Sequence, residues 1–308
     1  MIKQEDIWIF LSHSNKDYEK VRLVRNMLEE HSMRPLMFFL HCLNDDEELD
    51  SLIKREIDCR TRFILCDSEN ARNSHWVQKE VEYILSQNRI CETIDLEDSI
   101  DNIYNKLKSF IRQTKVFISY NREEYSTALQ VYNRLSKYDL KAYLDNYWAP
   151  KEQNYQQDYF NDTLQFLLKA VEEGCIVSIM TKRILDPYSC ARSEIIQAID
   201  KAKELKLPID RIFIPFVTEG SIIEEIKYDK AMLSLIDCDI CNLENNSPNH
   251  YADAIIEKIL TRLMTIGSIK VQADNFAKGI HVNEDKKEAQ FLYNLIDKVD
   301  KGLFYLPS

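Results

Sequence analysis

Residues 116–122 read VFISYNR, and residues 9–15 read IFLSHSN, which is the same pattern 107 positions earlier. In each stretch a short, almost continuous run of apolar residues ends at a serine. Such a run is typical of a strand that is buried on both faces, as the strands of a parallel sheet are. The correspondence continues into the following segment, where two apolar positions of an amphipathic helix repeat at the same offset. This internal repetition predicts two copies of one kind of domain.

Both copies continue with alternating apolar runs and helical stripes. The first helix of each copy has its apolar stripe at Val21, Val24 and Leu28, and at Ala128, Val131 and Leu135. The later strands are expected at 35–40, 63–66 and 90–94 in the first copy and at 140–144, 175–180 and 211–217 in the second, with closing helices at 100–111 and 251–264. This order predicts an α/β protein, in which each copy is a parallel sheet of about five strands with helices on both faces. Ligands of such sheets bind at the carboxyl ends of the strands.

Three parts are expected along the chain: residues 1–113, residues 114–265, and a C-terminal helical extension over 266–308. No Gly-, Pro- or Ser-rich linker separates the first two parts, which favours tight coupling between them. In the extension, apolar residues at 289, 292, 295, 296 and 299 form a helical stripe. Because such stripes usually serve packing, we favour docking onto the second domain. The alternative is a surface for assembly.

The net charge of the 308-residue chain is −11. The first 113 residues contain 16 Lys and Arg against 22 Asp and Glu, and the remainder contains 24 against 29, so both copies are acidic. This balance argues against a partner with a phosphate backbone, such as a nucleic acid, and against an anionic membrane. The five glycines do not cluster, which excludes a P-loop and a GxGxxG fingerprint, because both need glycines to bring backbone N–H groups against phosphate.

The expected location is the cytoplasm. The first six residues, MIKQED, include two acidic residues in a region where a signal peptide would be basic. No apolar run approaches the length of about 18 residues that a membrane-spanning helix needs. Eight scattered cysteines are typical of reduced thiols. Cys238 and Cys241 form a lone CxxC, which we interpret as two thiols at a strand end, since zinc normally needs four ligands. No metal site is predicted.

One helix in each copy contains a glutamate of interest. Residues 74–80 read SHWVQKE, so Glu80 lies four positions after Trp76 and shares a helix face with it and with Ile84. A carboxylate that borders an apolar stripe is a candidate for a partly desolvated functional acid. The alternative, which residue types and spacing alone favour, is an exposed glutamate on an ordinary amphipathic helix. In the second copy, residues 187–196 read PYSCARSEII and put Glu194 in the equivalent place.

The strand motif ending at Ser12 or Ser119, combined in order with SHWVQKE on a later helix, resembles the TIR (Toll/interleukin-1 receptor) domain. The resemblance covers residues 1–113 and 114–265, and it implies two flavodoxin-like domains. It also implies one of two functions. Many prokaryotic TIR domains cleave NAD+ in defence against phage, releasing nicotinamide and ADP-ribose or a cyclic or conjugated form that signals to a partner effector. Other TIR domains are non-catalytic adaptors that oligomerise.

In the NAD+-cleaving group the helix glutamate is catalytic, and the matching residues are Glu80 and Glu194. NAD+ would be the substrate, and no separate cofactor is implied. A single carboxylate suits this reaction, because the nicotinamide of NAD+ is already a pyridinium and leaves as a neutral amide without a general acid. The site must instead stabilise positive charge that grows on the ribose and orient the ribose hydroxyls. An aromatic residue such as Trp76 could stack on a base.

Further binding residues follow from the same resemblance. His13 and Ser14 in the first copy, and Tyr120 and Arg122 in the second, come directly after the first strand, where a ligand would bind. Arg122 could contact a phosphate with two hydrogen bonds, or it could be a solvated loop residue. Asp145 follows the second strand of the second copy and fits either a ribose contact or a turn.

The two copies depart from the TIR pattern in different ways. The loop after the second strand is short and acidic in the first copy, over 43–48, and long and aromatic in the second, over 147–160. Either copy could be active, or one site could use both; the quality of the helix motif favours Glu80. A third class, another flavodoxin-like nucleotide hydrolase or deoxyribosyltransferase, would also need a glutamate over a ribose. The expected partners are NAD+ and either further copies of the chain or an effector protein.

Overall fold

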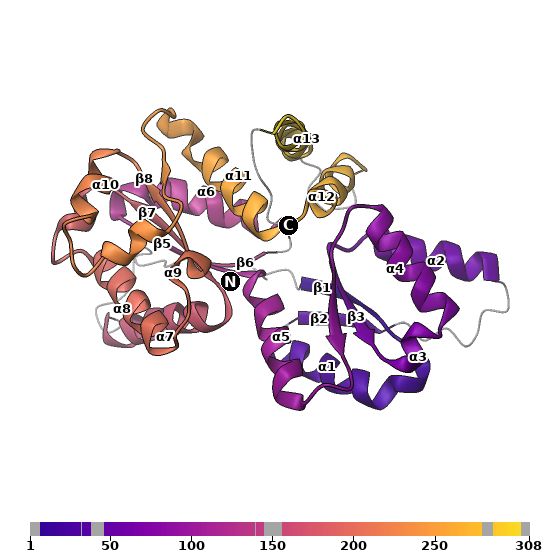
Figure 1. Cartoon of the computed structure of the whole chain (residues 1–308). Helices are drawn as coiled ribbons and strands as arrows, with labels where there is room; N and C mark the ends of the chain where they lie inside the picture. Colours follow the sequence, from indigo (N-terminus) through magenta and orange to yellow (C-terminus); the bar gives the residue numbers. More distant parts are fainter. Residues whose placement is uncertain are drawn as a thin grey trace. The chain divides into compact units, whose positions relative to one another are not determined.

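The computed structural model describes residues 7–31, 33–37, 46–138, 140–144, 156–278 and 286–302. Its contacts divide the chain into two compact units. Unit 1 consists of Lys3–Phe110 together with the segment from Leu260 onward, and unit 2 consists of Ile111–Ile259. Each unit is built around its own parallel sheet with helices on both faces (Figure 1).

Unit 1 contains four described strands in the order β2-β1-β3-β4, all parallel. Helices α2 and α4 pack on one face of this sheet, over Phe10 and Phe63. The elements are β1 (Ile7–Ser12), α1 (Tyr18–Glu30), β2 (Met33–Met37), α2 (Asp46–Asp58), β3 (Arg62–Asp67), α3 (Glu69–Arg72), α4 (His75–Ser86), β4 (Cys91–Asp95) and α5 (Ile100–Arg112), with a 3-10 turn η1 (Asn15–Asp17) after β1.

Unit 2 repeats this topology with five described strands, in the order β6-β5-β7-β8-β9. Helices α7 and α8 pack on one face, over Phe117, Ile176 and Met180. The elements are β5 (Lys115–Tyr120), η2 (Arg122–Glu124), α6 (Tyr125–Leu135), β6 (Lys141–Leu144), α7 (Gln156–Glu173), β7 (Cys175–Met180), η3 (Lys182–Leu185), α8 (Cys190–Glu204), α9 (Ile209–Ile212), β8 (Phe213–Val217), α10 (Ser221–Ile226), η4 (Leu233–Asp237), β9 (Cys241–Asn242), η5 (Pro248–His250) and α11 (Tyr251–Leu263), of which the residues from Leu260 onward belong to unit 1.

The predicted fold class is confirmed: two parallel sheets are flanked by helices and followed by C-terminal helices. The predicted stripes of the first helices are also confirmed, because all three positions in α1 and all three in α6 are buried. These stripes cover strands that are themselves buried along most of their length, as central strands of a parallel sheet must be.

One detail of the strand prediction is wrong, and one strand was not located. The run 211–217 is not one strand, since its first two residues end the short helix α9 and only Phe213–Val217 forms β8. Pro208 precedes α9, and its carbonyl accepts a hydrogen bond from Arg211 N at 3.2 Å, which closes a helical turn where apolar content predicted a strand. The last strand, β9, is only two residues long, too short to leave a periodic pattern.

The C-terminal segment packs in unit 1, so the expected docking onto the second domain is wrong. Helices α12 (Ile266–Lys278) and α13 (Lys286–Asp300) pack on each other, and Ala289, Leu292 and Leu295 of the predicted stripe are buried. The segment is fixed at the amino end of β3, where Arg62 donates a hydrogen bond to Leu263 O (3.2 Å) and Ser268 Oγ donates one to Thr61 O (3.1 Å).

The first turn of α12 lies against the end of α4. A Cβ added to Gly267 would lie 2.3 Å from Gln87 O and 2.4 Å from Asn88 O, which are backbone atoms that cannot move aside easily. Gly267 therefore permits a contact between backbones that another residue would prevent.

We expect Gly267→Ala to destabilise unit 1 by about 2 kcal/mol or more, because the new methyl group must displace backbone. Urea denaturation followed through the fluorescence of Trp8 and Trp76, which both lie in unit 1, measures this change. Lys270→Ala, at an exposed position of the same helix, is the control and should unfold like the wild type. Equal stability of the two variants would show that this backbone contact is not made.

Candidate functional site

Glu80 is buried in unit 1 and hydrogen-bonded to the last residue of β1. Its side chain belongs to a residue only 8% exposed, and Ser12 Oγ donates a hydrogen bond of 2.5 Å to Glu80 Oε2. Ser12 itself is 0% exposed. The interpretation of Glu80 as an exposed glutamate on an ordinary helix is therefore wrong. The pair lies at the carboxyl end of β1, the edge of a parallel sheet at which ligands bind.

The start of α4 determines which way Glu80 points. Ser74 has an extended backbone and caps the helix, its hydroxyl accepting a hydrogen bond from Val77 N at 3.5 Å. With the helix beginning there, Val77, Glu80 and Ile84 form its buried stripe, spaced three and four residues apart. The carboxylate thus occupies a position in the stripe where an apolar residue would ordinarily pack.

Burial changes the acidity of Glu80. Removal from water disfavours the charged form and raises the pKa of Glu80 from 4.5 to about 7, while the hydrogen bond from Ser12 opposes that rise. Glu80 therefore gains and loses its proton near neutral pH. A carboxylate with such a pKa is typical of functional sites, although buried structural groups show it too.

Unit 2 contains the same arrangement. Ser119 is the fifth residue of β5, and its Oγ donates a hydrogen bond of 2.6 Å to Glu194 Oε2 on α8. Helix α8 is also capped by a serine, Ser189, whose hydroxyl accepts from Arg192 N at 3.4 Å. Glu194 is half-buried, more accessible than Glu80. Sequence reasoning selected the glutamates but did not identify Ser12 and Ser119 as their partners. The feature that could have identified them is the polar residue at the end of each apolar run.

His13 and Ser14 follow the serine of β1, and both are buried. His13 Nδ1 donates a hydrogen bond to Leu11 O at 2.9 Å, and burial lowers the pKa of His13, an effect that this hydrogen bond partly offsets. Burial thus favours the neutral form of its imidazole. Ser14 caps η1, accepting from Lys16 N at 3.3 Å. The contacts of Ser14 are those of a residue that shapes the loop after β1.

The equivalent loop of unit 2 is fixed by a buried amide. Asn121 Oδ1 accepts a hydrogen bond from Thr181 N, and Asn121 Nδ2 donates one to Ser189 Oγ, both at 3.2 Å. This side chain joins the ends of β5 and β7 to the cap of α8, so it fixes the start of the helix that contains Glu194. Sequence reasoning did not select it.

The other predicted binding residues lie around these loops. Tyr120 is half-buried with its ring centroid 6.0 Å from that of Tyr125, and Arg122 is exposed at the start of η2. Asp145 lies outside the described residues, as do the acidic 43–45 and the aromatic 147–155. The binding roles of Tyr120, Arg122 and Asp145 stay predictions.

Trp76 packs with part of its ring against the core under α2 and α4. The Lys79 ammonium lies over this ring, 4.9 Å from its centroid, and 4.0 Å from an Asp50 carboxylate oxygen. A base that stacks on the same face must displace Lys79. A pyridinium would also be repelled by the ammonium, so Trp76 suits a neutral base such as adenine better than nicotinamide.

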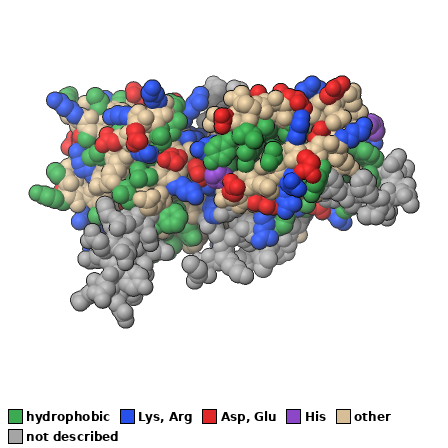
Figure 2. Space-filling model, turned by 90° about the horizontal axis from the view of Figure 1, so that it is seen from below, with side chains coloured by type: hydrophobic (Ala, Val, Ile, Leu, Met, Phe, Trp, Pro, Cys, Tyr) green, Lys and Arg blue, Asp and Glu red, His purple; other side chains and the backbone are tan. Residues whose placement is uncertain are grey.

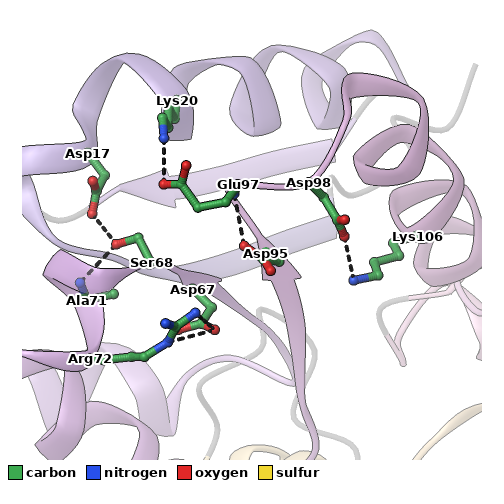
Figure 3. Close-up of polar contacts among 10 residues, drawn as sticks. All are labelled: Asp17, Lys20, Asp67, Ser68, Ala71, Arg72, Asp95, Glu97, Asp98 and Lys106. Atoms are coloured by element: carbon green, nitrogen blue, oxygen red, sulfur yellow. Dashed lines mark hydrogen bonds and ion pairs between the residues drawn. The ribbon is translucent and has the colours of Figure 1, made fainter.

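Acidic side chains surround the carboxyl ends of β3 and β4 (Figure 3). Asp67 at the end of β3 holds Arg72 through Nε and Nη2 at 3.0 and 2.9 Å. Lys20 pairs with Glu97 at 2.6 Å, and Asp17 accepts a hydrogen bond from Ser68 Oγ at 2.6 Å. The cations drawn there are paired with carboxylates, so an incoming phosphate would compete with these pairs for them.

The remaining sequence predictions concern metal ligands, cysteines and membrane spans. Among the described residues, no three or more His, Cys, Asp and Glu side chains gather as metal ligands would. Cys238 follows η4 and Cys241 begins β9, and neither forms a disulfide among the described cysteines. No helix within the described ranges is long and apolar enough to cross a membrane. Figure 2 shows basic and acidic side chains interspersed over the face drawn.

The comparison with protein families agrees with the geometry of unit 1. A TIR domain is found at residues 9–99. The match begins inside β1, includes both Ser12 and Glu80, and ends at the start of α5. No curated protein is similar enough to the chain to count as a match. TIR domains include both NAD+-cleaving enzymes and scaffolds, so the family match alone does not choose between these functions.

We expect Glu80→Gln to remove a pH dependence from the stability of unit 1. In the folded chain Glu80 titrates near 7 instead of 4.5, so the folded state holds the extra proton between these values, and stability falls as pH rises through that window. The difference corresponds to about 3 kcal/mol. The variant should match the wild type near pH 4 and exceed its stability by up to that amount above pH 7.

Urea denaturation between pH 4 and 8.5 measures this effect. Glu82→Gln, at an exposed position of the same helix, is the matched control and should follow the wild-type curve. If the difference in unfolding free energy between the wild type and Glu80→Gln stays constant over the whole pH range, the burial of an ionisable Glu80 is contradicted.

Proposed function

We propose that the chain cleaves the bond between nicotinamide and ribose in NAD+, with Glu80 of the TIR domain as the catalytic carboxylate. The observation that carries this proposal is the buried Glu80 carboxyl group, hydrogen-bonded to Ser12 at the carboxyl end of β1. The products would be nicotinamide and ADP-ribose, or a cyclic or conjugated form of it. Glu194 is the equivalent candidate in unit 2, which we propose to be a second TIR-like domain.

The chemistry fits a single glutamate. As the bond to the pyridinium nitrogen lengthens, positive charge moves onto the ribose, and an ionised carboxylate beside the ribose stabilises it. The effect is strong where little water screens the charge, and Glu80 is in such a place. Nicotinamide takes the bonding electrons and leaves neutral, so no proton has to be supplied to the leaving group.

The ionised form of Glu80 is required in this reaction, which predicts a pH dependence. In the free protein Glu80 gains its charge as pH rises through about 7, so kcat/KM should rise over the same range. Bound NAD+ brings a positive pyridinium close to the carboxylate, which favours its ionised form. The rise in kcat should therefore occur at a lower pH than the rise in kcat/KM. Steady-state nicotinamide release between pH 5.5 and 9 measures both, and a flat kcat/KM profile would contradict the proposal.

Substitution of each glutamate identifies the active unit. We expect Glu80→Gln to reduce nicotinamide release by about 100-fold or more, because the amide cannot stabilise the developing charge. Glu194→Gln tests unit 2 in the same way, and Glu82→Gln is the exposed control on α4. Protein concentration should be varied, since a domain that must assemble is inactive when dilute. Equal activity of all three variants would remove the catalytic assignment.

Absence of nicotinamide release at every concentration would favour the rival function, a non-catalytic adaptor with two TIR-like domains. Both functions involve self-association or a partner effector, which light scattering over a range of concentrations tests for the chain itself. The setting that we propose is a cytoplasmic signal in prokaryotic defence against phage, and the resemblance of the chain to the TIR proteins that act there supports it.

A further inference from the structure

The two hydroxyl–carboxylate pairs are the most similar features of the two units. In each unit a serine near the carboxyl end of the first strand along the chain, β1 or β5, is almost fully buried, 0% exposed for Ser12 and 1% for Ser119. Each donates a hydrogen bond to Oε2 of the helix glutamate, at 2.5 Å and 2.6 Å. Bonds of this length between a hydroxyl and a carboxylate belong to the strong, charge-assisted class.

Local sequence does not explain why the pair occurs twice. The two serines are 107 positions apart, whereas the two glutamates are 114 apart. Glu80 is the sixth residue of α4, and Glu194 is the fifth residue of α8. The glutamate thus occupies a different position in each helix, and the chain between serine and glutamate differs in length. The hydrogen bond between serine and glutamate is nevertheless present in both units.

A structural explanation alone accounts poorly for these serines. Burying a hydroxyl costs free energy unless it is hydrogen-bonded, and a small apolar residue would fit beside the apolar residues that precede each serine, Ile9–Leu11 and Val116–Ile118. A buried glutamate is costlier still. Replacing both partners by apolar residues would avoid both costs, yet both units keep the polar pair.

We propose, on the basis of the proposed function, that Ser12 and Ser119 are positioning residues that orient the carboxylates of Glu80 and Glu194 for the ribose of NAD+. The serine hydroxyl donates its hydrogen bond to Oε2 and thereby fixes the rotation of the carboxylate. In unit 1 this leaves Oε1 as the oxygen that meets the developing charge. The same hydrogen bond stabilises the ionised form of Glu80 against the effect of burial.

Unit 1 offers the cleaner test, because the two units differ beside the serine. Ser12 stands opposite Leu65 of β3 in the register, whereas Ser119 stands opposite Ser178 of β7. Ser178 is buried, and its hydroxyl has no hydrogen-bond partner among the described residues. A Ser119→Ala variant would therefore keep a hydroxyl on the neighbouring strand that could replace the lost one.

The decisive experiment follows the titration of Glu80 without any substrate. Glutamate labelled with carbon-13 at the side-chain carboxyl group is observed by NMR between pH 4 and 9, and the signal absent from Glu80→Gln is that of Glu80. Ser12→Ala should move the midpoint upward by about one pH unit, because it removes the donor to the carboxylate. Ser12→Thr, which keeps the hydroxyl, should stay near the wild type, and Ser12→Cys, a weak donor, should fall between.

Ser68→Ala is the matched control. It removes a buried 2.6 Å hydrogen bond from a serine to a carboxylate of unit 1, that of Asp17, together with the cap of α3, and so costs at least as much stability as Ser12→Ala. It should leave the Glu80 midpoint unchanged. The rise of kcat/KM with pH should move with the NMR midpoint in the Ser12 variants and not in Ser68→Ala.

The outcomes separate this proposal from the proposed function. A Glu80 midpoint that is the same in Ser12→Ala and the wild type overturns the positioning role, whatever the activity. If Ser12→Ala shifts the Glu80 midpoint but the wild type releases no nicotinamide, the result supports control of the carboxylate by Ser12 and contradicts NAD+ cleavage. If Ser12→Ala does not fold, Ser12→Cys decides, since it keeps the size of the side chain and weakens the bond.

Discussion

The hydrogen bond between Ser12 and Glu80 joins the central strand of unit 1 to the helix that packs on it, at a place from which water is largely excluded. Two opposing effects meet there. Burial favours the neutral carboxyl group, and the hydroxyl donor favours the ionised one. Burial is the larger, since the pKa of Glu80 rises to about 7 despite the bond. The group is thereby brought to the pH range in which a cell can use either of its forms.

The rest of unit 1 keeps this pair in place. Parallel strands bring the ends of β1, β3 and β4 to one edge, and the caps of η1, α3 and α4 fix the loops that leave that edge. The C-terminal segment is attached at the opposite edge, at the amino end of β3, where Arg62 donates a hydrogen bond to Leu263 O and Ser268 of α12 donates one to Thr61 O. Gly267 of α12 lies against the backbone that follows α4. These contacts of the described C-terminal residues thus lie at the edge of the sheet opposite to Glu80.

A negatively charged substrate would meet an excess of carboxylates at that edge of the sheet. Carboxylates outnumber cations in the chain, and the lysines and arginines near the ends of β3 and β4 are paired with Asp and Glu. A dinucleotide would exchange these surface pairs for contacts with its phosphates. Exposed ion pairs contribute little stability, so the exchange is not costly. The pyridinium of the proposed substrate NAD+, in contrast, would be attracted by the acidic surroundings.

The sequence by itself determined the α/β class, the repetition and most helix faces, because apolar periodicity reports which side of a helix or strand is buried. It also singled out Glu80 and Glu194. It did not decide that Glu80 is buried, since a glutamate beside an apolar stripe lies in the core or in solvent according to how α4 packs against the sheet. Nor did it show the partnership of Ser12 with Glu80, residues 68 positions apart. The tertiary structure decided these points, and the place of the C-terminal helices, because they depend on contacts between elements that no local pattern encodes.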